Sequence, residues 1–375
     1  MKSPWPTKKL GEICEIRMGE TLIEKDLTGE GIPVYSADSL EVPWGFTSNN
    51  RLRFYRGSII IGARGTIGSV KLPTDEIFTA TQTTIVLTPK IKEVASPFLY
   101  YFLRKINFKS IQRGTGIPML TVGTLSSFEI PLPPFSIQQK IVKILDTIQS
   151  AVELQEKIVE KTKELKKSMM AELFKYGGPS FRRGGKLKKT EIGEVPEDWE
   201  VVRLGEVCDL YQPKTISGKE ILEEGPYKVY GANGVIGYYT KYNHEDSEVL
   251  ITCRGSTCGS INVSEPKSWI TGNAMVVHPK VKNLNKKFLY YLLYNSDLSK
   301  TISGSGQPQI TRATLYPYKI PLPSFPEQQE IAEILQTIDQ KIEIEKKKKE
   351  LYEELFKTML NKIMSQEINV EKIEV

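Results

Sequence analysis

The chain has 375 residues, of which 39% are hydrophobic and 26% are charged, and its formal net charge is +6. This composition excludes an intrinsically disordered chain, and the length suits two or three domains of ordinary size. Four cysteines cannot form a disulfide framework and no run of 18 apolar residues occurs, so we expect a cytoplasmic protein with no membrane partner. The small positive charge permits a polyanionic partner, although solubility alone explains it equally well.

The first half of the sequence recurs in the second half. Residues 114–148 align with residues 304–338 at an offset of 190. Between residues 98 and 148 this offset gives 23 identities in 51 positions, whereas about three are expected from typical residue frequencies near 6%. Repeats of this length indicate two complete homologous domains related by a pseudo-twofold, and they exclude a solenoid of short repeats. Such a protein is suited to a ligand that has two parts.

Short runs rich in β-branched residues predict strands in each copy. The clearest runs are residues 58–62 and 84–87 in the first copy and residues 248–252 and 274–277 in the second. A helix is expected to start near Pro97 and another near Asn285, because the sequence FLYY supplies an apolar face at both places. The pattern predicts an α+β fold with two homologous globular domains built on twisted β-sheets.

A long helix is predicted after each globular copy. Ile-Pro-Leu-Pro at 130–133 and 320–323 ends each copy as an extended segment, because proline fixes φ and biases the preceding residue away from helix. The first helix has a seam of Ile141, Ile144, Ile148, Ala151, Ile158, Thr162, Leu165 and Met169, interrupted at Gln155. The second has Ile331, Ile334, Leu335, Ile338, Ile342, Tyr352, Leu355, Phe356 and Met359, interrupted by Glu345 and the lysines 346–349. This spacing predicts an antiparallel coiled coil, in which the lysine run is either a solvated face or a nucleic-acid contact.

These signals divide the chain into five segments. They are a globular domain at 1–133, a helix at 134–176, a basic linker at 177–195, a second globular domain at 196–323 and a helix at 324–375. The first helix is expected to end near Tyr176, because Gly177 and Gly178 terminate it. Residues 175–189 carry six Lys or Arg and no acidic residue, which fits either phosphate contacts or a soluble, mobile segment.

Residues that could catalyse a reaction or bind a metal are scarce. The two histidines, His244 and His278, form no metal-ligand pattern, and Cys253 and Cys258 lack the CxxC spacing. Residues 132–135, Leu-Pro-Pro-Phe, lack the polar residue with which amino-methyltransferases hold their target base. No Walker A sequence or glycine-rich S-adenosylmethionine loop is present. We therefore expect no metal, no cofactor and no catalysis, and the alternative is a DNA methyltransferase or nuclease with an unrecognised active site.

Two glycine-rich loops in each copy carry side chains that suit DNA. The first loop supplies the candidates Arg64, Gly65 and Thr66 in one copy and Arg254, Gly255 and Ser256 in the other. Glycine backbone with arginine and a hydroxyl can bind a phosphodiester, although a tight β-turn explains the pattern as well. The second loop supplies Arg113 and Thr115 in one copy and Gln307, Gln309 and Arg312 in the other. Glutamine can pair with adenine and arginine with guanine, and divergence between the copies fits either different targets or drift.

The junction of proline segment and helix, IPLP-x-F-x-x-QQ-x-I-x-x-IL-x-TI, starts at Ile130 and again at Ile320. With the duplication and the long helices, it resembles the specificity (S) subunits of type I restriction-modification systems over essentially the whole chain. The family usually has Glu-Gln at this junction, as at Glu327 and Gln328, whereas the first copy has Ile137 and Gln138. The resemblance implies a non-catalytic subunit whose target recognition domains, 1–133 and 196–323, each read half of a bipartite double-stranded DNA target.

The resemblance also implies that the two helices are spacers that dock methyltransferase (M) subunits, two of them, and fix the gap between the half-sites. A helix of roughly 40 residues spans about 60 Å, so half-sites about one DNA turn apart would fit. Restriction motor-nuclease (R) subunits would join through the complex, and S-adenosylmethionine, Mg and ATP would bind only to these partners. A structural adaptor without DNA contact is the alternative function.

Apolar side chains of the helices are the candidates for docking the M subunits. The candidate residues are Ile141, Leu145, Val152, Val159, Ile331, Leu335 and Ile342. Three of them, Leu145, Val152 and Val159, lie outside the predicted mutual seam. The alternative for these three is a wider stripe of contacts within the chain.

Overall fold

The computed structural model describes residues 5–38, 40–111, 119–182, 185–304 and 307–373. These residues form two compact units, each of which combines a globular domain with one part of each long helix. Unit 1 consists of Met1–Glu156 and Lys347–Val375, and unit 2 consists of Lys157–Lys346. No helix in the described part of the chain is long and apolar enough to cross a bilayer.

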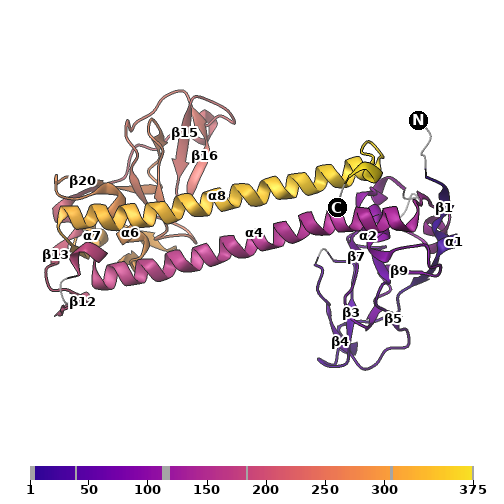
Figure 1. The fold of residues 1–375 in the computed structure, drawn as a ribbon. Coiled ribbons are helices and arrows are strands. Elements are labelled where there is room, and N and C mark those ends of the chain that lie inside the picture. Colours follow the sequence, from indigo (N-terminus) through magenta and orange to yellow (C-terminus); the bar gives the residue numbers. More distant parts are fainter. Residues whose placement is uncertain (1–4, 39, 112–118, 183–184, 305–306, 374–375) are drawn as a thin grey trace. The chain divides into compact units, whose positions relative to one another are not determined.

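Unit 1 contains two four-stranded sheets and one strand pair (Figure 1). The central sheet has the order β2 (Cys14–Met18), β9 (Thr84–Pro89), β6 (Ile59–Gly62) and β7 (Val70–Lys71). The second sheet has the order β4 (Gly45–Thr47), β3 (Ile32–Tyr35), β8 (Ile77–Ala80) and β5 (Phe54–Tyr55). The strand pair is β1 (Thr7–Lys9) with β10 (Glu129–Pro131), and the helices are α1 (Leu10–Ile13), α2 (Ser96–Lys105) and α3 (Val122–Ser126).

Unit 2 repeats this plan. Its central sheet has the order β14 (Cys208–Tyr211), β20 (Ala274–Pro279), β17 (Val249–Thr252) and β18 (Ile261–Val263). Its second sheet has the order β16 (Gly234–Tyr239), β15 (Tyr227–Gly231) and β19 (Trp269–Ile270). The strand pairs are β13 (Glu200–Arg203) with β23 (Lys319–Leu322) and β21 (Ile302–Ser303) with β22 (Gln309–Ile310), and the helices are α5 (Leu204–Val207), α6 (Lys286–Tyr294) and α7 (Arg312–Leu315). The four predicted strands and the two FLYY helices are therefore confirmed.

Short 3-10 segments complete the described secondary structure. They are η1 (Glu24–Asp26), η2 (Phe108–Ile111), η3 (Pro179–Phe181), η4 (Gly218–Glu220), η5 (Ser299–Thr301) and η6 (Val370–Lys372). The basic linker contains a hairpin of β11 (Leu187–Thr190) and β12 (Gly193–Pro196). Arg182 pairs with Glu172 at 2.7 Å, and Lys319 of β23 pairs with Glu191 of the hairpin. These ion pairs join the linker to α4 and to β23 within unit 2, which the sequence pattern did not predict.

The central strand of each unit is buried on both faces, which explains its continuous apolar sequence. In β6, Ile59 and Ile61 contribute to the main core with α2, whereas Ile60 contributes to a second cluster with Phe78. In β17, Val249 and Ile251 point into the main core, and Leu250 points into the smaller cluster. The alternation follows the two-residue period of a strand. Each domain therefore has two hydrophobic clusters on opposite faces of one sheet.

The long helices are α4 (Phe135–Tyr176) and α8 (Phe325–Met364). In unit 1 the core joins Leu145 of α4 to Phe356 and Leu360 of α8. In unit 2 the core joins Leu173 of α4 to Leu335 of α8. The early part of each helix thus packs with the late part of the other within each unit, and the predicted antiparallel pairing is confirmed.

The buried stripe of α4 differs from the predicted seam by one residue. Leu145, Val152 and Val159 are buried, whereas Leu165 of the predicted seam has an exposed fraction of 52%. Residues 145, 152 and 159 repeat every seven positions just as residues 144, 151, 158 and 165 do. The heptad spacing alone cannot choose between the two stripes, because α4 also packs against the globular domain.

The predicted seam of α8 is also partly wrong. Tyr352 and Leu355 are exposed, while Phe356 is buried. The predicted interruptions of the seams, Gln155 and Glu345, are buried as well. Glu345 pairs with Lys341 one turn earlier at 2.5 Å, which satisfies a charge that would be costly to bury alone.

A buried glutamine ties each long helix to its globular domain. The Oε1 atom of Gln138 accepts a hydrogen bond from the backbone N–H of Ala95 at 2.9 Å, and its Nε2 atom donates to the carbonyls of Glu93 and Pro133, both at 2.8 Å. This glutamine is fully buried. The three bonds join the proline segment, the first turn of α4 and the approach to α2.

Gln328 makes the same three bonds in unit 2. It accepts from Asn285 at 2.8 Å and donates to Asn283 at 3.0 Å and to Pro323 at 2.9 Å. The neighbouring glutamines, Gln139 and Gln329, are exposed. Only the first glutamine of the repeated Gln-Gln pair is therefore required by the fold.

The departure from Glu-Gln in the first copy also has a structural reason. The Oε1 atom of Glu327 accepts from the backbone N–H of Gly178, which follows the end of α4, at 3.0 Å. Burial raises the pKa of this carboxyl. Ile137 stands at the same position in unit 1 and packs against the core. The two helix starts therefore face different neighbours, one polar and one apolar.

We predict that Gln328→Ala lowers the free energy of unfolding by about 1–3 kcal/mol, because buried backbone groups lose their partners. Gln329→Ala is the matched control, and an exposed substitution of this kind changes stability by no more than about 0.5 kcal/mol. Denaturant unfolding followed by circular dichroism measures both variants. Equal stabilities would show that the buried amide does not hold the helix to the domain.

Candidate functional site

In unit 1, three loops meet where β6 ends. The backbone N–H groups of Ala63 and Arg64 donate to the carbonyl of Thr83 at 2.8 and 3.0 Å, and the N–H of Thr66 donates to Ala37 at 3.3 Å. We call residues 36–38, 63–69 and 81–83 the first loop cluster. Arg64, Gly65 and Thr66 are exposed in it, so one arginine, one hydroxyl and flexible backbone are available to a ligand.

The same arrangement recurs in unit 2. The N–H of Cys253 donates to Asn273 at 3.1 Å, and the hydroxyl of Thr252 donates to the carbonyl of Ala232. We call residues 231–233, 253–260 and 271–273 the second loop cluster. Gly68 and Gly259 form equivalent turns, with φ of 81° and 91°. The N–H of each glycine donates at 2.9 Å to the backbone carbonyl of the last residue of the preceding strand. The second copy therefore has one extra residue inside an otherwise conserved loop.

The second glycine-rich loop of the sequence joins this cluster. Arg254 forms a β-bridge with Gln309, and the N–H of Ile310 donates to Cys253 at 2.9 Å. Gln307 is exposed and Arg312 is exposed at the start of α7. The structure thus brings Arg254 and Gln309 together, although they are 55 residues apart in the sequence.

In unit 1 the corresponding segment returns to the first loop cluster. The N–H of Leu120 donates to Ala63 at 3.0 Å, and the guanidinium of Arg64 lies 3.9 Å from the sulfur of Met119. The candidates Arg113 and Thr115 lie outside the described residues.

In each unit a polar pair links the loop cluster to the adjoining edge strand of the central sheet, and the sequence pattern does not indicate it. Lys71 of β7 has a side chain only 4% exposed, and its Nζ atom lies 2.6 Å from Oδ1 of Asp38. In unit 2, the Nδ2 atom of Asn262 lies 3.5 Å from Oδ1 of Asn233. The sequences VYSAD at 34–38 and VYGAN at 229–233 are the signal for this match, but their offset is 195. A comparison at the fixed offset of 190 does not align them.

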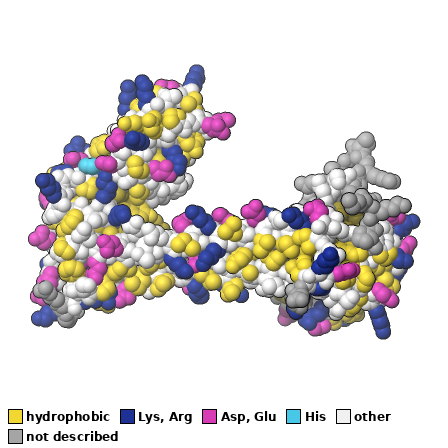
Figure 2. Space-filling model, turned by 45° about the horizontal axis from the view of Figure 1, so that its top comes forward, with side chains coloured by type: hydrophobic (Ala, Val, Ile, Leu, Met, Phe, Trp, Pro, Cys, Tyr) yellow, Lys and Arg dark blue, Asp and Glu magenta, His cyan; other side chains and the backbone are white. Residues whose placement is uncertain are grey.

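Apolar, basic and acidic side chains share the surface of the domain in unit 2 that carries β15 and β16 (Figure 2). Val235 and Ile236 on the edge strand β16 have exposed fractions of 46% and 50%. Lys or Arg can neutralise phosphates, and apolar side chains can contact the methyl group of thymine.

The two histidines of the chain lie in one polar cluster of unit 2. The buried carboxylate of Glu248 lies 2.9 Å from Nδ1 of His278 and 3.2 Å from Nζ of Lys286. His244 stacks on Tyr211, and its Nε2 atom lies 3.0 Å from the Tyr211 hydroxyl. Within the described residues, no group of three or more His, Cys, Asp or Glu side chains is arranged to hold a metal ion.

Unit 1 has Ser58 and Thr88 where this cluster has Glu248 and His278, and their hydroxyls lie 2.9 Å apart. The charged cluster is therefore not required by the fold. The cysteines are equally unsuited to chemistry, because burial raises the pKa of the thiols of Cys14 and Cys208 to about 12.

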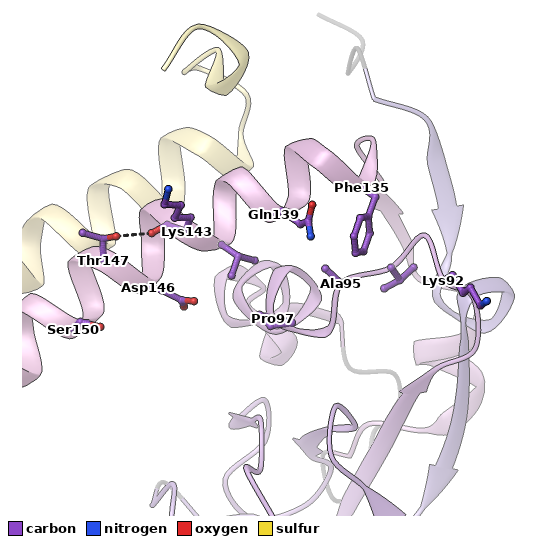
Figure 3. A pocket seen from close by; sticks show the side chains of 11 residues that line it. Lys92, Ala95, Pro97, Phe135, Gln139, Lys143, Asp146, Thr147 and Ser150 are labelled. Carbon is purple, nitrogen blue, oxygen red and sulfur yellow. Dashed lines mark hydrogen bonds between the residues drawn. The ribbon is translucent and has the colours of Figure 1, made fainter. Parts of the chain in front are cut away.

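A groove of about 800 Å³ lies between α4 and the approach to α2 in unit 1. Figure 3 shows Phe135, Gln139 and Asp146 along α4 and Ala95 and Pro97 opposite them. A smaller groove of about 270 Å³ stands at the equivalent place in unit 2 and includes the equivalent glutamine.

Each long helix begins with an exposed phenylalanine, and Phe135 lines the groove of unit 1. The exposed fractions of Phe135 and Phe325 are 41% and 36%. The same exposed pair of phenylalanine and glutamine thus marks both helix starts.

The seven apolar helix candidates for partner contact are not on the surface. Ile141, Leu145, Val152, Val159, Ile331, Leu335 and Ile342 are all buried. The expectation that these residues are free to meet a partner is wrong for Leu145, which packs with Phe356 and Leu360 in the core of unit 1, and Val152 and Val159 are buried as well. Any partner of the helices must contact other side chains first.

Within the described residues, the two units share one fold and one arrangement of loop clusters, as expected for a duplicated protein. The family model described as "Type I restriction modification DNA specificity domain" matches residues 2–164 and again residues 196–354. The type I restriction enzyme MjaVIII specificity subunit of Methanocaldococcus jannaschii is 32% identical over 84% of this chain and 77% of its own length. The putative type I restriction enzyme MjaX specificity subunit of the same organism is 31% identical over 76% of this chain and 71% of its own length.

Solved structures show the same fold. The type I restriction-modification S subunit from M. genitalium matches with a TM-score of 0.63 and 22% identity over 96% of this chain and 95% of that one. A chain from a structural study of complex assembly and conformational transition of the type I R-M system matches with a TM-score of 0.61 and 21% identity over 97% and 99%.

The chain belongs to the specificity subunits of type I restriction-modification systems. Specificity subunits are non-catalytic and distinct from the methyltransferase and restriction subunits. The resemblance, the α+β fold of two homologous domains with two long antiparallel helices, and the prediction that the chain is not an enzyme are therefore confirmed. The roles of the individual candidate residues stay predictions.

The histidine cluster predicts a pH dependence of stability. Burial lowers the pKa of His244 below its usual value of 6.5, so the unfolded chain binds a proton more readily than the folded chain. The free energy of unfolding is therefore highest above pH 6.5. It decreases as the pH drops through the lowered pKa of His244. The midpoint of thermal unfolding of the wild type and of His244→Gln, measured between pH 5 and 7.5, should diverge only below pH 6.5. Parallel curves would contradict the assignment.

Proposed function

We propose that each unit of this specificity subunit reads one half of a bipartite double-stranded DNA target. The observation that carries the proposal is the pair of loop clusters, which share one backbone arrangement and an exposed arginine but differ at other positions, such as Asp38 and Asn233. Arg64 and Thr66 occupy the places in the first loop cluster that Arg254 and Ser256 occupy in the second. A shared backbone can approach DNA in the same way twice, and different side chains then select different bases.

Charge and backbone chemistry support contact with a duplex. Each cluster offers an exposed arginine beside glycine turns, which suits phosphate oxygens. In unit 2, Gln309 lies at a β-bridge to the arginine-bearing loop, where an amide can pair with an adenine edge. Phosphate contacts position the domain, and the amide and hydroxyl groups supply discrimination.

We propose that the helices dock two methyltransferase subunits, one at each repeated groove. Restriction motor-nuclease subunits join through that complex. The chain itself carries no cofactor, and S-adenosylmethionine, Mg and ATP bind to these partners. A chromosomal DNA target places the complex in the cytoplasm.

We also propose that α4 and α8 fix the gap between the half-sites. The support is that each helix contributes packing residues to both units, so neither helix can change length without altering the cores that share it. The gap is then a property of the chain and not of the partner subunits.

The function is tested by co-expression with the methyltransferase subunit, followed by sequencing that detects methyladenine in host DNA. The wild-type complex should methylate a motif with two defined halves and a fixed gap. Arg64→Ala and Arg254→Ala should each reduce the rate of methylation by about tenfold or more, because a phosphate or base contact is lost. A stable complex that yields no motif would favour an adaptor without DNA contact.

Docking is tested at the two exposed phenylalanines. Phe135→Glu and Phe325→Glu should each leave one methyltransferase subunit bound per chain, and the double variant should bind none at concentrations that saturate the wild type. Loss of a central aromatic contact weakens binding by about 30-fold or more. Native mass spectrometry measures the stoichiometry.

Tyr55→Glu is the control for docking, because Tyr55 is a 58% exposed aromatic residue of unit 1 outside the groove. Retention of two methyltransferase subunits by the double variant would place the docking surface elsewhere. Circular dichroism confirms that the variants fold.

A further inference from the structure

We infer that the polar pair at each loop cluster determines which base that domain accepts, with Asp38 and Lys71 in unit 1 and Asn233 and Asn262 in unit 2. The inference rests on the proposed function, because it assumes that the loop clusters face DNA. It adds the chemistry of one recognised base in each half-site.

The strand register shows that the two pairs occupy equivalent positions. Tyr35 of β3 pairs in parallel with Ala80 of β8, and Tyr230 of β15 pairs in parallel with Ile270 of β19. In both units the residue after that partner donates its N–H to the tyrosine carbonyl at 2.9 Å. The three residues that follow each tyrosine, 36–38 and 231–233, therefore correspond.

The second member of each pair corresponds as well. Lys71 of β7 lies opposite Ile60, and Asn262 of β18 lies opposite Leu250. Ile60 and Leu250 are themselves equivalent at the offset of 190. The same two places in the fold thus hold an ion pair in unit 1 and two amides in unit 2.

The ion pair in unit 1 holds one hydrogen-bond acceptor, the carboxyl group of Asp38, in a fixed position. The side chain of Lys71 is almost completely buried, and a buried amine needs a polar partner, which the carboxyl group of Asp38 supplies. Oδ1 of Asp38 takes the Lys71 ammonium at 2.6 Å and the N–H of Leu40 at 2.9 Å. In the described part of the chain Oδ2 takes no donor, and the side chain is 36% exposed. One carboxylate oxygen therefore remains for a ligand.

The amide pair offers different chemistry. The 3.5 Å separation between Asn262 Nδ2 and Asn233 Oδ1 is long for a hydrogen bond, and Asn233 is exposed. An amide presents both a donor and an acceptor, whereas a carboxylate presents only acceptors. At a major-groove edge, the carboxylate accepts from the amine of cytosine or adenine, and the amide pairs two-pronged with adenine.

The fold does not demand either pair. The central sheets keep the same strand order and the same antiparallel partners with Lys71 or Asn262 on the edge strand. A buried lysine is costly to retain for packing alone. Lys71 instead holds the partly exposed carboxyl group of Asp38 in one orientation, and we infer that this orientation serves base recognition.

The test exchanges the pairs between the units in the complete complex with methyltransferase subunits. Asp38→Asn combined with Lys71→Asn gives unit 1 the pair of unit 2 and leaves no unpaired buried charge. The methylated motif should then change at one position of one half, with about 10- to 100-fold lower methylation of the original sequence. The other half and the gap should stay as in the wild type.

The reciprocal variant, Asn233→Asp combined with Asn262→Lys, should change one position of the other half. Glu76→Gln is the matched control, because Glu76 is an exposed carboxylate of unit 1 paired with Arg56 at 3.0 Å, away from the cluster. It should leave the motif unchanged. If the first double variant does not fold, the single variant Asn233→Asp tests the inference, because the side chain of Asn233 is exposed.

The outcomes separate this inference from the proposed function. A wild-type complex that methylates no bipartite motif overturns the proposed function. A wild-type complex with a bipartite motif, and exchanged variants with that same motif at the same rate, overturns the inference alone.

Discussion

The buried amide at the first turn of each long helix is the interaction on which each unit depends. Gln138 and Gln328 each make three hydrogen bonds to backbone groups of the proline segment and of the approach to the FLYY helix. A buried amide without partners would cost more than the bonds contribute, so the three segments must meet in one geometry. The groove and its exposed phenylalanine lie beside this junction and take their shape from it.

Much of the fold follows from patterns in the sequence. The duplication predicts two homologous domains, the apolar runs predict the buried strands, and the proline segments predict where the helices begin. The orientation of α4 about its own axis cannot be predicted from the sequence pattern. Two stripes of the helix repeat every seven residues, and only contacts with the domain decide which stripe is buried. The sequence pattern also does not predict the hairpin of the linker, because its strands are short and polar.

The candidate site was predicted in part. Both glycine-rich loops were recognised, and in unit 2 the structure brings Arg254 to Gln309. The pairs of Asp38 with Lys71 and of Asn233 with Asn262 were missed, because the segment from Asp38 to Ser58 is five residues longer than that from Asn233 to Glu248, so the offset is 195 before it and 190 after it. The charged cluster of Glu248 with His278 and Lys286 was missed for another reason, since its equivalent in unit 1 consists of hydroxyl residues. Features that differ between the copies give no signal in a search for repeats.

The division of the chain into units has a consequence for how the protein is made. Unit 1 contains the first 156 residues and also Lys347–Val375, and Phe356, Leu360 and Ile363 complete its core. Unit 1 therefore lacks part of its interior until residues 347–375, which follow all of unit 2 in the sequence, have been synthesised. Unit 2, by contrast, is one continuous segment of chain and can finish folding earlier. The apolar residues Ile141 and Leu145 of α4 stay without these partners while unit 2 is synthesised, and the late turns of α8 then cover them.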